Sequence, residues 1–182
     1  HESVDRLIAN FWSSGGRGQI VGAHGSGKST LLRAMLGRFE ESGHATVLIE
    51  LHSHQRRLPM LPRLPASPGR PPVVAIDGFE QLGAYSSWRV ARWCKRRNHG
   101  LLLTTHRRHA MPFALLGVRL PVLYHTRPTL ALVHEIVRAL VDDRDNRINS
   151  VDVEQSLAQH PGDVRETLFR LYELYEARRR ER

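Results

Sequence analysis

The chain of 182 residues is long enough for one well-buried core with a small appended subdomain, and we do not expect two full domains. Hydrophobic residues make up 41% of it and charged residues 25%, which excludes a wholly disordered chain. The 27 Lys and Arg against 18 Asp and Glu give a formal net charge of +9, so an anionic partner is expected: a nucleotide, a nucleic acid or an acidic protein.

Cysteine usage and hydropathy predict the compartment. The lone Cys94 has no second cysteine with which to form an internal disulfide, which favours a reducing environment. No apolar run approaches the length of a membrane span. We therefore expect a cytoplasmic protein with no membrane partner.

The first quarter of the chain alternates helical and strand patterns. Residues 4–12 carry apolar side chains at helical spacing before "SSGGRG" breaks the pattern, and residues 19–23 read as a buried strand. Residues 28–39 have an apolar stripe typical of a helix packed on a sheet, and residues 45–51 form a β-branched strand pattern. This order predicts a β-α-β unit.

Residues 52–72 differ in kind, because a proline recurs at every third position. These prolines are Pro59, Pro62, Pro65, Pro68 and Pro71. A polyproline II helix has three residues per turn, so the prolines would line one face of such a helix. The pattern predicts a semi-rigid exposed connector, and docking to a protein partner through this proline-rich arm is the alternative.

Strand and helix patterns then resume. Residues 73–77 and 101–105 are apolar runs typical of central parallel strands, and residues 86–97 between them read as a helix. A short helix is expected over residues 111–117 and a last strand over residues 119–125. The alternation predicts an α/β fold with a doubly wound, mostly parallel, five-stranded sheet.

Beyond residue 126 the alternation stops and three helical patterns follow. They cover residues 129–141, 151–160 and 162–180. The last begins with Asp163 and Glu166 at the spacing of a capping box. We predict an α/β domain over residues 1–126 and a small, lid-like helical subdomain over residues 127–182.

The stretch "GAHGSGKST" fits the phosphate-loop pattern G-x-x-x-x-G-K-[ST] between a predicted strand and helix. Its glycines let backbone N–H groups surround phosphate oxygens, and the following helix adds its positive dipole end. Lys28 is expected at the β- and γ-phosphates, and the Ser29 hydroxyl on Mg²⁺. The expected nucleotide-binding residues are Gly22, Ala23, His24, Gly25, Ser26, Gly27, Lys28, Ser29 and Thr30.

A second motif follows at "VVAIDGFEQL", which resembles the Walker B segment of P-loop NTPases. Asp77 ends the predicted strand, where ligands bind in open α/β sheets. Asp77 is therefore expected to hold Mg²⁺ from the side opposite Ser29. Because a guanine-specific N-K-x-D sequence is absent, ATP is favoured over GTP.

Two later segments complete a family resemblance. "LLLTTHRRH" is similar to the sensor-1 position of AAA+ proteins and offers Thr104, Thr105 and His106 at a strand end. "PGDVRETL" is similar to the sensor-2 segment, which implies that Arg165 contacts the γ-phosphate. From about Gly18 onwards the chain thus resembles P-loop NTPases of the AAA+ type. The likeness is greatest to small replication-initiator, helicase-loader and transposition-helper ATPases.

The resemblance leaves the hydrolytic residues open. The AAA+ pattern places a catalytic glutamate directly after the Walker B aspartate, where this chain has Gly78. Glu80, three residues beyond Asp77, and Glu50, at the end of an earlier strand, are the alternatives. The arginine finger that the family supplies to a neighbouring subunit has no clear match. Arg107, Arg108 and Arg119 are positional candidates.

Two functions from different classes follow from these motifs. The first is an ATPase, dependent on ATP and Mg²⁺, that couples its nucleotide state to DNA, RNA or a protein partner. The second is a nucleotide-binding switch or scaffold with little or no hydrolysis, which the glycine after Asp77 favours. A phosphotransferase is less favoured, because the core lacks the arginine-rich mobile lid of small-molecule kinases.

Overall fold

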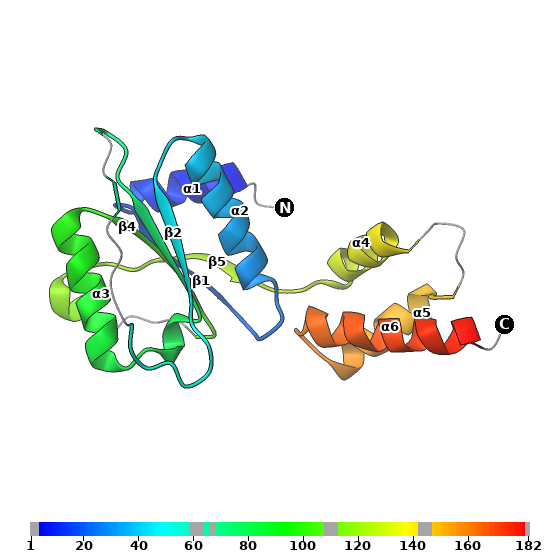
Figure 1. The fold of residues 1–182 in the computed structure, drawn as a ribbon. Helices are drawn as coiled ribbons and strands as arrows, with labels where there is room; N and C mark the ends of the chain where they lie inside the picture. The colour runs from blue at the N-terminus through cyan, green and yellow to red at the C-terminus, as the bar shows by residue number, and fades with distance from the viewer. Residues whose placement is uncertain (1–3, 59–63, 66–67, 108–112, 142–146, 181–182) are drawn as a thin grey trace. The chain divides into compact units, whose positions relative to one another are not determined.

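The computed structural model describes residues 4–58, 64–65, 68–107, 113–141 and 147–180 (Figure 1). In chain order the elements, with η denoting a short 3₁₀ helix, are α1 (Val4–Ser13), β1 (Arg17–Gly22), α2 (Lys28–Glu41), β2 (Thr46–Glu50), β3 (Val73–Asp77), η1 (Phe79–Gln81), α3 (Ala84–Arg97), β4 (Gly100–Thr105), η2 (Ala114–Leu116), β5 (Val122–Thr126), α4 (Leu130–Leu140), α5 (Ser150–Gln159) and α6 (Val164–Arg180). None of the helices within these described ranges is long and apolar enough to cross a membrane.

The chain divides into two compact units. The α/β unit contains His1–Gly22 and Lys28–His125, and the helical unit contains Ala23–Gly27 and Thr126–Arg182.

The α/β unit is built on a five-stranded sheet with the order β2-β3-β4-β1-β5. The strand pairs β1 with β4, β3 with β4 and β2 with β3 are parallel. Every residue of β4 is buried, as its almost continuous apolar sequence predicts for a strand covered on both faces. The fold class predicted from the sequence is therefore confirmed. Because β4 lies between β1 and β3, its carboxyl end lies between the ends of those two strands.

Helices cover the sheet on both faces (Figure 1). On one face, side chains of α1 and α2 such as Phe11 and Leu32 share a core with Leu102 of β4. On the other face, Val90 of α3 shares a core with Leu101 and Leu103. Successive strand residues thus alternate between an α1–α2 face and an α3 face.

Most predicted elements are confirmed with shifted ends, and two differ in kind or extent. The helix expected over residues 111–117 is the short η2, while Met111 and Pro112 lie outside the described residues. The last strand begins at Val122 rather than at residue 119, directly after Pro121, which has no N–H to donate to a sheet.

The proline-rich arm joins β2 to β3. Its described residues form no helix, as its proline content predicts, and Pro65 and Pro68 are exposed. Pro59 and Pro62 lie outside the described residues. The polyproline II conformation and the docking role stay predictions.

The helical unit has its own small core, in which Val133, Val153, Val164 and Leu171 are buried. Asn149 and Asp152 form a complete capping box at the start of α5, which the sequence pattern did not predict. At α6 the Asp163 carboxylate accepts the Glu166 N–H at 3.2 Å, which is one of the two bonds of the predicted box.

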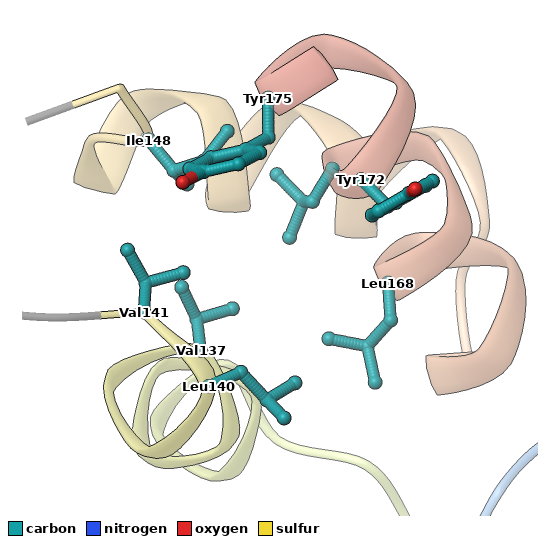
Figure 2. Close-up of a pocket in the computed structure, with 8 residues that line it drawn as sticks. Val137, Leu140, Val141, Ile148, Leu168, Tyr172 and Tyr175 are labelled. Carbon is teal, nitrogen blue, oxygen red and sulfur yellow. The ribbon is translucent and has the colours of Figure 1, made fainter. Parts of the chain in front are cut away.

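An apolar pocket of about 400 Å³ lies within the helical unit, between residues of α4 and of α6 (Figure 2). Its lining residues are Val137, Leu140, Val141, Ile148, Leu168, Leu171, Tyr172 and Tyr175. The Arg147 guanidinium lies over the Tyr175 ring, 5.1 Å from its centroid, and also donates to the Tyr175 hydroxyl at 2.8 Å. These contacts fix one side of the pocket.

Candidate nucleotide-binding site

The phosphate-loop sequence follows β1 directly and ends where α2 begins. Gly22 is the last residue of β1 and Lys28 the first of α2. Gly25 and Gly27 have φ of +66° and +89°, a left-handed conformation in which only glycine is free of strain. The motif glycines therefore permit a tight loop between a strand and a helix, as the sequence predicts.

Lys28 and Ser29 stand in the first turn of α2. Lys28 is only 8% exposed, which is rare for a lysine, and Ser29 is half-buried. Thr30, next in the helix, is exposed. Buried lysines are kept where an anion or a polar partner offsets the loss of hydration.

The loop residues are fixed by contacts within the helical unit. The Ser26 hydroxyl donates to the Ala23 carbonyl at 2.8 Å and forms a 2.6 Å bond with the Thr126 hydroxyl. A Cβ atom on Gly25 would lie 1.8 Å from the Asp163 Oδ1 atom, so no larger residue fits there. His24 is exposed.

Asp77 is held at the carboxyl end of β3 by the neighbouring strand. The Thr104 hydroxyl of β4 donates to the Asp77 carboxylate and accepts the Gly78 N–H at 2.9 Å. Alternation along β3 places Asp77 on the same face as Val73 and Ala75, which pack in the core shared with α2. The carboxylate therefore lies on the sheet face that α2 covers.

Gly78 adopts a left-handed conformation directly after Asp77. Its φ is +75°, and a Cβ atom there would lie 3.1 Å from the Leu51 carbonyl oxygen. A glutamate at this position would be strained and crowded. The left-handed turn aims the Gly78 N–H at Thr104, so it completes the link that fixes Asp77.

The two candidate glutamates have different surroundings. Glu80 lies in η1, where its Oε1 atom is 3.4 Å from His106 Nε2. Its Oε2 atom is buried and has no hydrogen-bond partner among the described residues. Glu50, at the end of β2, forms an ion pair with Arg33 of α2, and both side chains are largely exposed.

Thr104 and Thr105 point to opposite faces of the sheet. Thr104 contacts Asp77 on the α1–α2 face. Thr105 lies on the same face of β4 as Leu101 and Leu103, which pack with α3. Its buried Oγ1 has no hydrogen-bond partner within the described part of the chain. The structure thus brings Thr104, and not Thr105, to Asp77, while the sensor role of Thr105 stays a prediction.

The predicted arginines are all on the surface where the structure describes them. Arg165 is exposed in the first turn of α6, and its contact with a γ-phosphate stays a prediction. Arg107 and Arg119 are exposed, and Arg108 lies outside the described residues. None of these positions identifies an arginine finger.

The donor set suits a magnesium ion shared with a phosphate chain. Ser29 offers a hydroxyl and Asp77 a carboxylate, the hard oxygen ligands that Mg²⁺ prefers. The described residues contain no group of three or more His, Cys, Asp or Glu side chains that could hold a metal by themselves. Mg²⁺ in nucleotide sites keeps several waters and binds through one or two protein oxygens and substrate phosphates.

Comparison with known proteins supports the fold. No protein-family model matches the chain, and no curated protein matches it in sequence. Among solved structures, that of PCH-2 from C. elegans is similar, with a TM-score of 0.52 and 12% sequence identity. The match covers 98% of this chain and 70% of that chain. At this identity the likeness concerns the fold alone.

Proposed function

We propose that this protein binds ATP with Mg²⁺ at its phosphate loop and hydrolyses it, as an AAA+-like ATPase that couples its nucleotide state to a partner. The observation that carries the proposal is the Thr104 link. A buried hydroxyl orients the Asp77 carboxylate on the sheet face covered by α2, and the first turn of α2 carries Lys28 and Ser29.

Each residue has a distinct role in the proposed site. Backbone N–H groups of the loop and the Lys28 ammonium bind the phosphates, and Ser29 and Asp77 hold Mg²⁺. Bound Mg²⁺ neutralises the charge that develops on the transferred phosphoryl group. Thr104 keeps Asp77 in one orientation, which lowers the cost of arranging the site before the reaction.

Glu80 is the proposed acceptor of a proton from the attacking water. The Glu80 side chain is 25% exposed and its Oε2 atom has no hydrogen-bond partner among the described residues, whereas the Glu50 carboxylate is engaged by Arg33. His106 beside the other Glu80 oxygen restricts the orientation of the carboxylate. A residue that positions or deprotonates water is what phosphoryl transfer to water requires.

The second candidate function, a nucleotide-binding switch with little hydrolysis, is favoured by Gly78. Its left-handed conformation disfavours the glutamate that the AAA+ pattern places there. If Glu80 does not reach the water, the site binds ATP without turning it over. The two functions share the binding site and differ only in phosphate release.

The deciding experiment measures ATP binding by calorimetry and phosphate release on the same preparations. The proposal expects Lys28→Ala to lose binding, and Glu80→Gln to keep binding and lose turnover. Glu50→Gln is the matched control and should keep both. Binding without phosphate release in the unmodified protein would establish the switch, and an absence of binding in folded protein would refute both functions.

A further inference from the structure

Helix α3 has an unusual distribution of charge. Its 14 residues include five basic side chains and no acidic one. The basic residues are Arg89, Arg92, Lys95, Arg96 and Arg97. The five positive charges of this one helix equal more than half of the chain's formal net charge of +9.

One side of α3 is buried and the opposite side carries the charge. Ser87, Val90, Ala91 and Cys94 are buried against the sheet. The outer side is a stripe of Tyr85, Trp88, Arg89, Arg92 and Arg96, at the i, i+3, i+4, i+7 and i+11 spacing of one helical face. We call these five residues the α3 stripe. Lys95 is excluded because its ammonium donates to the Leu116 carbonyl at 2.6 Å.

The stripe arginines differ from five arginines of α2 and α6. Arg33, Arg38, Arg170, Arg178 and Arg179 each form an ion pair with a carboxylate. In contrast, no carboxylate among the described residues lies within 4.0 Å of the stripe guanidinium groups. The charge of the stripe is therefore not neutralised by the described part of the protein itself.

Aromatic rings are interleaved with these arginines. The Tyr85 and Trp88 rings lie 6.3 Å apart and nearly parallel, with 23° between their planes. The Arg89 guanidinium lies 5.9 Å from the Tyr85 centroid, and that of Arg92 lies 5.4 Å from the Trp88 centroid. Tyr85 is 71% exposed, so its ring is open to a ligand.

We propose that the α3 stripe binds single-stranded nucleic acid, with bases stacked on Tyr85 and Trp88 and phosphates held by the stripe arginines. Phosphate contacts supply affinity, and aromatic rings accept any unpaired base because every base has a flat face. From Tyr85 to Arg96 the helix rises about 17 Å, which equals the rise of about five stacked nucleotides.

The composition of the stripe favours a single strand over other polyanions. A duplex buries its base faces, so the exposed ring of Tyr85 would gain nothing from it. The proposed contacts, to phosphates and to base faces, are the same in DNA and RNA, so strands of both kinds should bind with similar affinity. The stripe shares no residue with the proposed nucleotide site, so the inference does not depend on the proposed ATPase function.

The test is fluorescence anisotropy of labelled poly-deoxythymidine and poly-uridine strands, without nucleotide, over a range of salt concentrations. Arg89→Ala/Arg92→Ala should weaken binding about tenfold or more and reduce the slope of log affinity against log salt by about 1.4. The control Arg170→Ala/Arg179→Ala removes the same net charge from α6. It should leave affinity nearly unchanged.

Stacking is tested by a pair of variants at Tyr85. Tyr85→Ala should weaken binding about fivefold or more with the salt slope unchanged, and Tyr85→Phe should retain binding. Because Tyr85 is largely exposed, neither change should disturb the fold, which circular dichroism and retained ATP binding verify.

Several results would overturn the proposal. Two concern the variants: an equal loss of affinity in the α3 and α6 double variants, and no effect of Tyr85→Ala. Two concern the ligand: tighter binding of a duplex than of a single strand, and a strong preference for RNA. The last is competition by polyglutamate as effective as that by an unlabelled strand, which would indicate an acidic protein partner. Lys28→Ala should keep strand binding. An unmodified protein that binds ATP but no single strand would refute this inference alone, and one that binds a single strand but no ATP would refute only the proposed ATPase.

Discussion

The hydroxyl group of Thr104 joins the ends of β3 and β4. It is fully buried, donates to the Asp77 carboxylate and accepts the Gly78 N–H. Thr104→Val keeps the shape of the side chain and removes both bonds. We expect the free energy of unfolding to fall by about 1–3 kcal/mol, because a partly buried N–H loses its acceptor. Urea unfolding measures this change, and Mg²⁺-dependent phosphate release should fall as well.

Thr105→Val is the matched control. Its Oγ1 is buried without a hydrogen-bond partner among the described residues, so removing the hydroxyl costs no bond. The free energy of unfolding should stay equal or rise. If Thr105→Val abolishes phosphate release while Thr104→Val preserves it, the sensor role belongs to Thr105, as the family resemblance implies.

Gly78 forms a tight turn directly after β3. Its φ of +75° and the 3.1 Å approach of the Leu51 carbonyl to a Cβ atom make Gly78→Ala strained. We expect it to lower the free energy of unfolding by about 1–3 kcal/mol, measured in urea. Gly37→Ala in α2 is the control, since nothing lies within 4 Å of its Cβ position. It should stabilise the protein by about 0.5–1 kcal/mol, and an equal loss in both variants would contradict this account.

The end of α6 is linked to the start of α5 by an ion pair. The Arg178 guanidinium donates to both oxygens of Asp152, at 2.6 and 2.9 Å. The Asp152 carboxylate also accepts the Asn149 N–H of its capping box at 2.9 Å. One carboxylate thus both caps the start of α5 and binds the end of α6.

This arrangement makes the stability of the helical unit depend on pH. The hydrogen bonds from Arg178 hold the pKa of Asp152 below its usual value, against the opposing effect of burial. Asp152 therefore stabilises the fold above the pKa of the unfolded chain, about 4, and this contribution is lost as the pH falls through the lower folded value. Asp152→Asn should lower the melting temperature near neutral pH, and the difference from the unmodified protein should shrink in acid.

Circular dichroism at two pH values checks this expectation. Glu173→Gln is a suitable control, because the Glu173 and Arg170 side chains are 49% and 58% exposed and such a pair contributes little. A melting-temperature difference for Asp152→Asn that stays constant from neutral to acid pH would contradict the role of the carboxylate charge.

Elements with a strong periodic pattern were predictable from the sequence. Apolar stripes at helical spacing predict α2 and α6, because one face of each helix must be buried. Continuous apolar runs predict the strands β3 and β4, because both faces must be buried. The capping box of α5 was missed, since Asn149 and Asp152 do not match the usual serine or threonine and glutamate pair. The start of β5 was misplaced because Pro121 interrupts the apolar pattern.

The order of the strands in the sheet could not be read from the sequence. The phosphate-loop and Asp77 motifs are local in the sequence. The structure places both at strand ends, as predicted, with Gly22 ending β1 and Asp77 ending β3. Thr104 and Asp77 lie 27 positions apart in the sequence. They meet because β3 pairs with β4. Likewise, the charge of α3 is visible in the sequence, but its lack of carboxylate partners among the described residues is a property of the folded chain.

The single cysteine reports on whether the α/β unit is intact. Cys94 of α3 is fully buried against the sheet, and burial raises the pKa of its thiol to about 12, with a smaller opposing effect of the Arg17 charge. At pH 8 only about one thiol in ten thousand is then ionised, and the thiolate is the reactive form. We expect a thiol reagent to label the native protein very slowly. Urea should accelerate labelling, and the urea concentration at the midpoint of this increase should equal that of global unfolding.

The same measurement controls for the variants of α3. Arg89 and Arg92 lie on the exposed side of the helix, so their replacement by alanine should leave the labelling rate in buffer unchanged. Val90→Ala, by contrast, removes two buried carbon atoms beside Cys94 and should both destabilise the unit by about 1–2 kcal/mol and speed labelling. Rapid labelling of the unmodified protein in buffer would show that α3 leaves the sheet readily, and a stripe presented on a rigid helix would then be the wrong description.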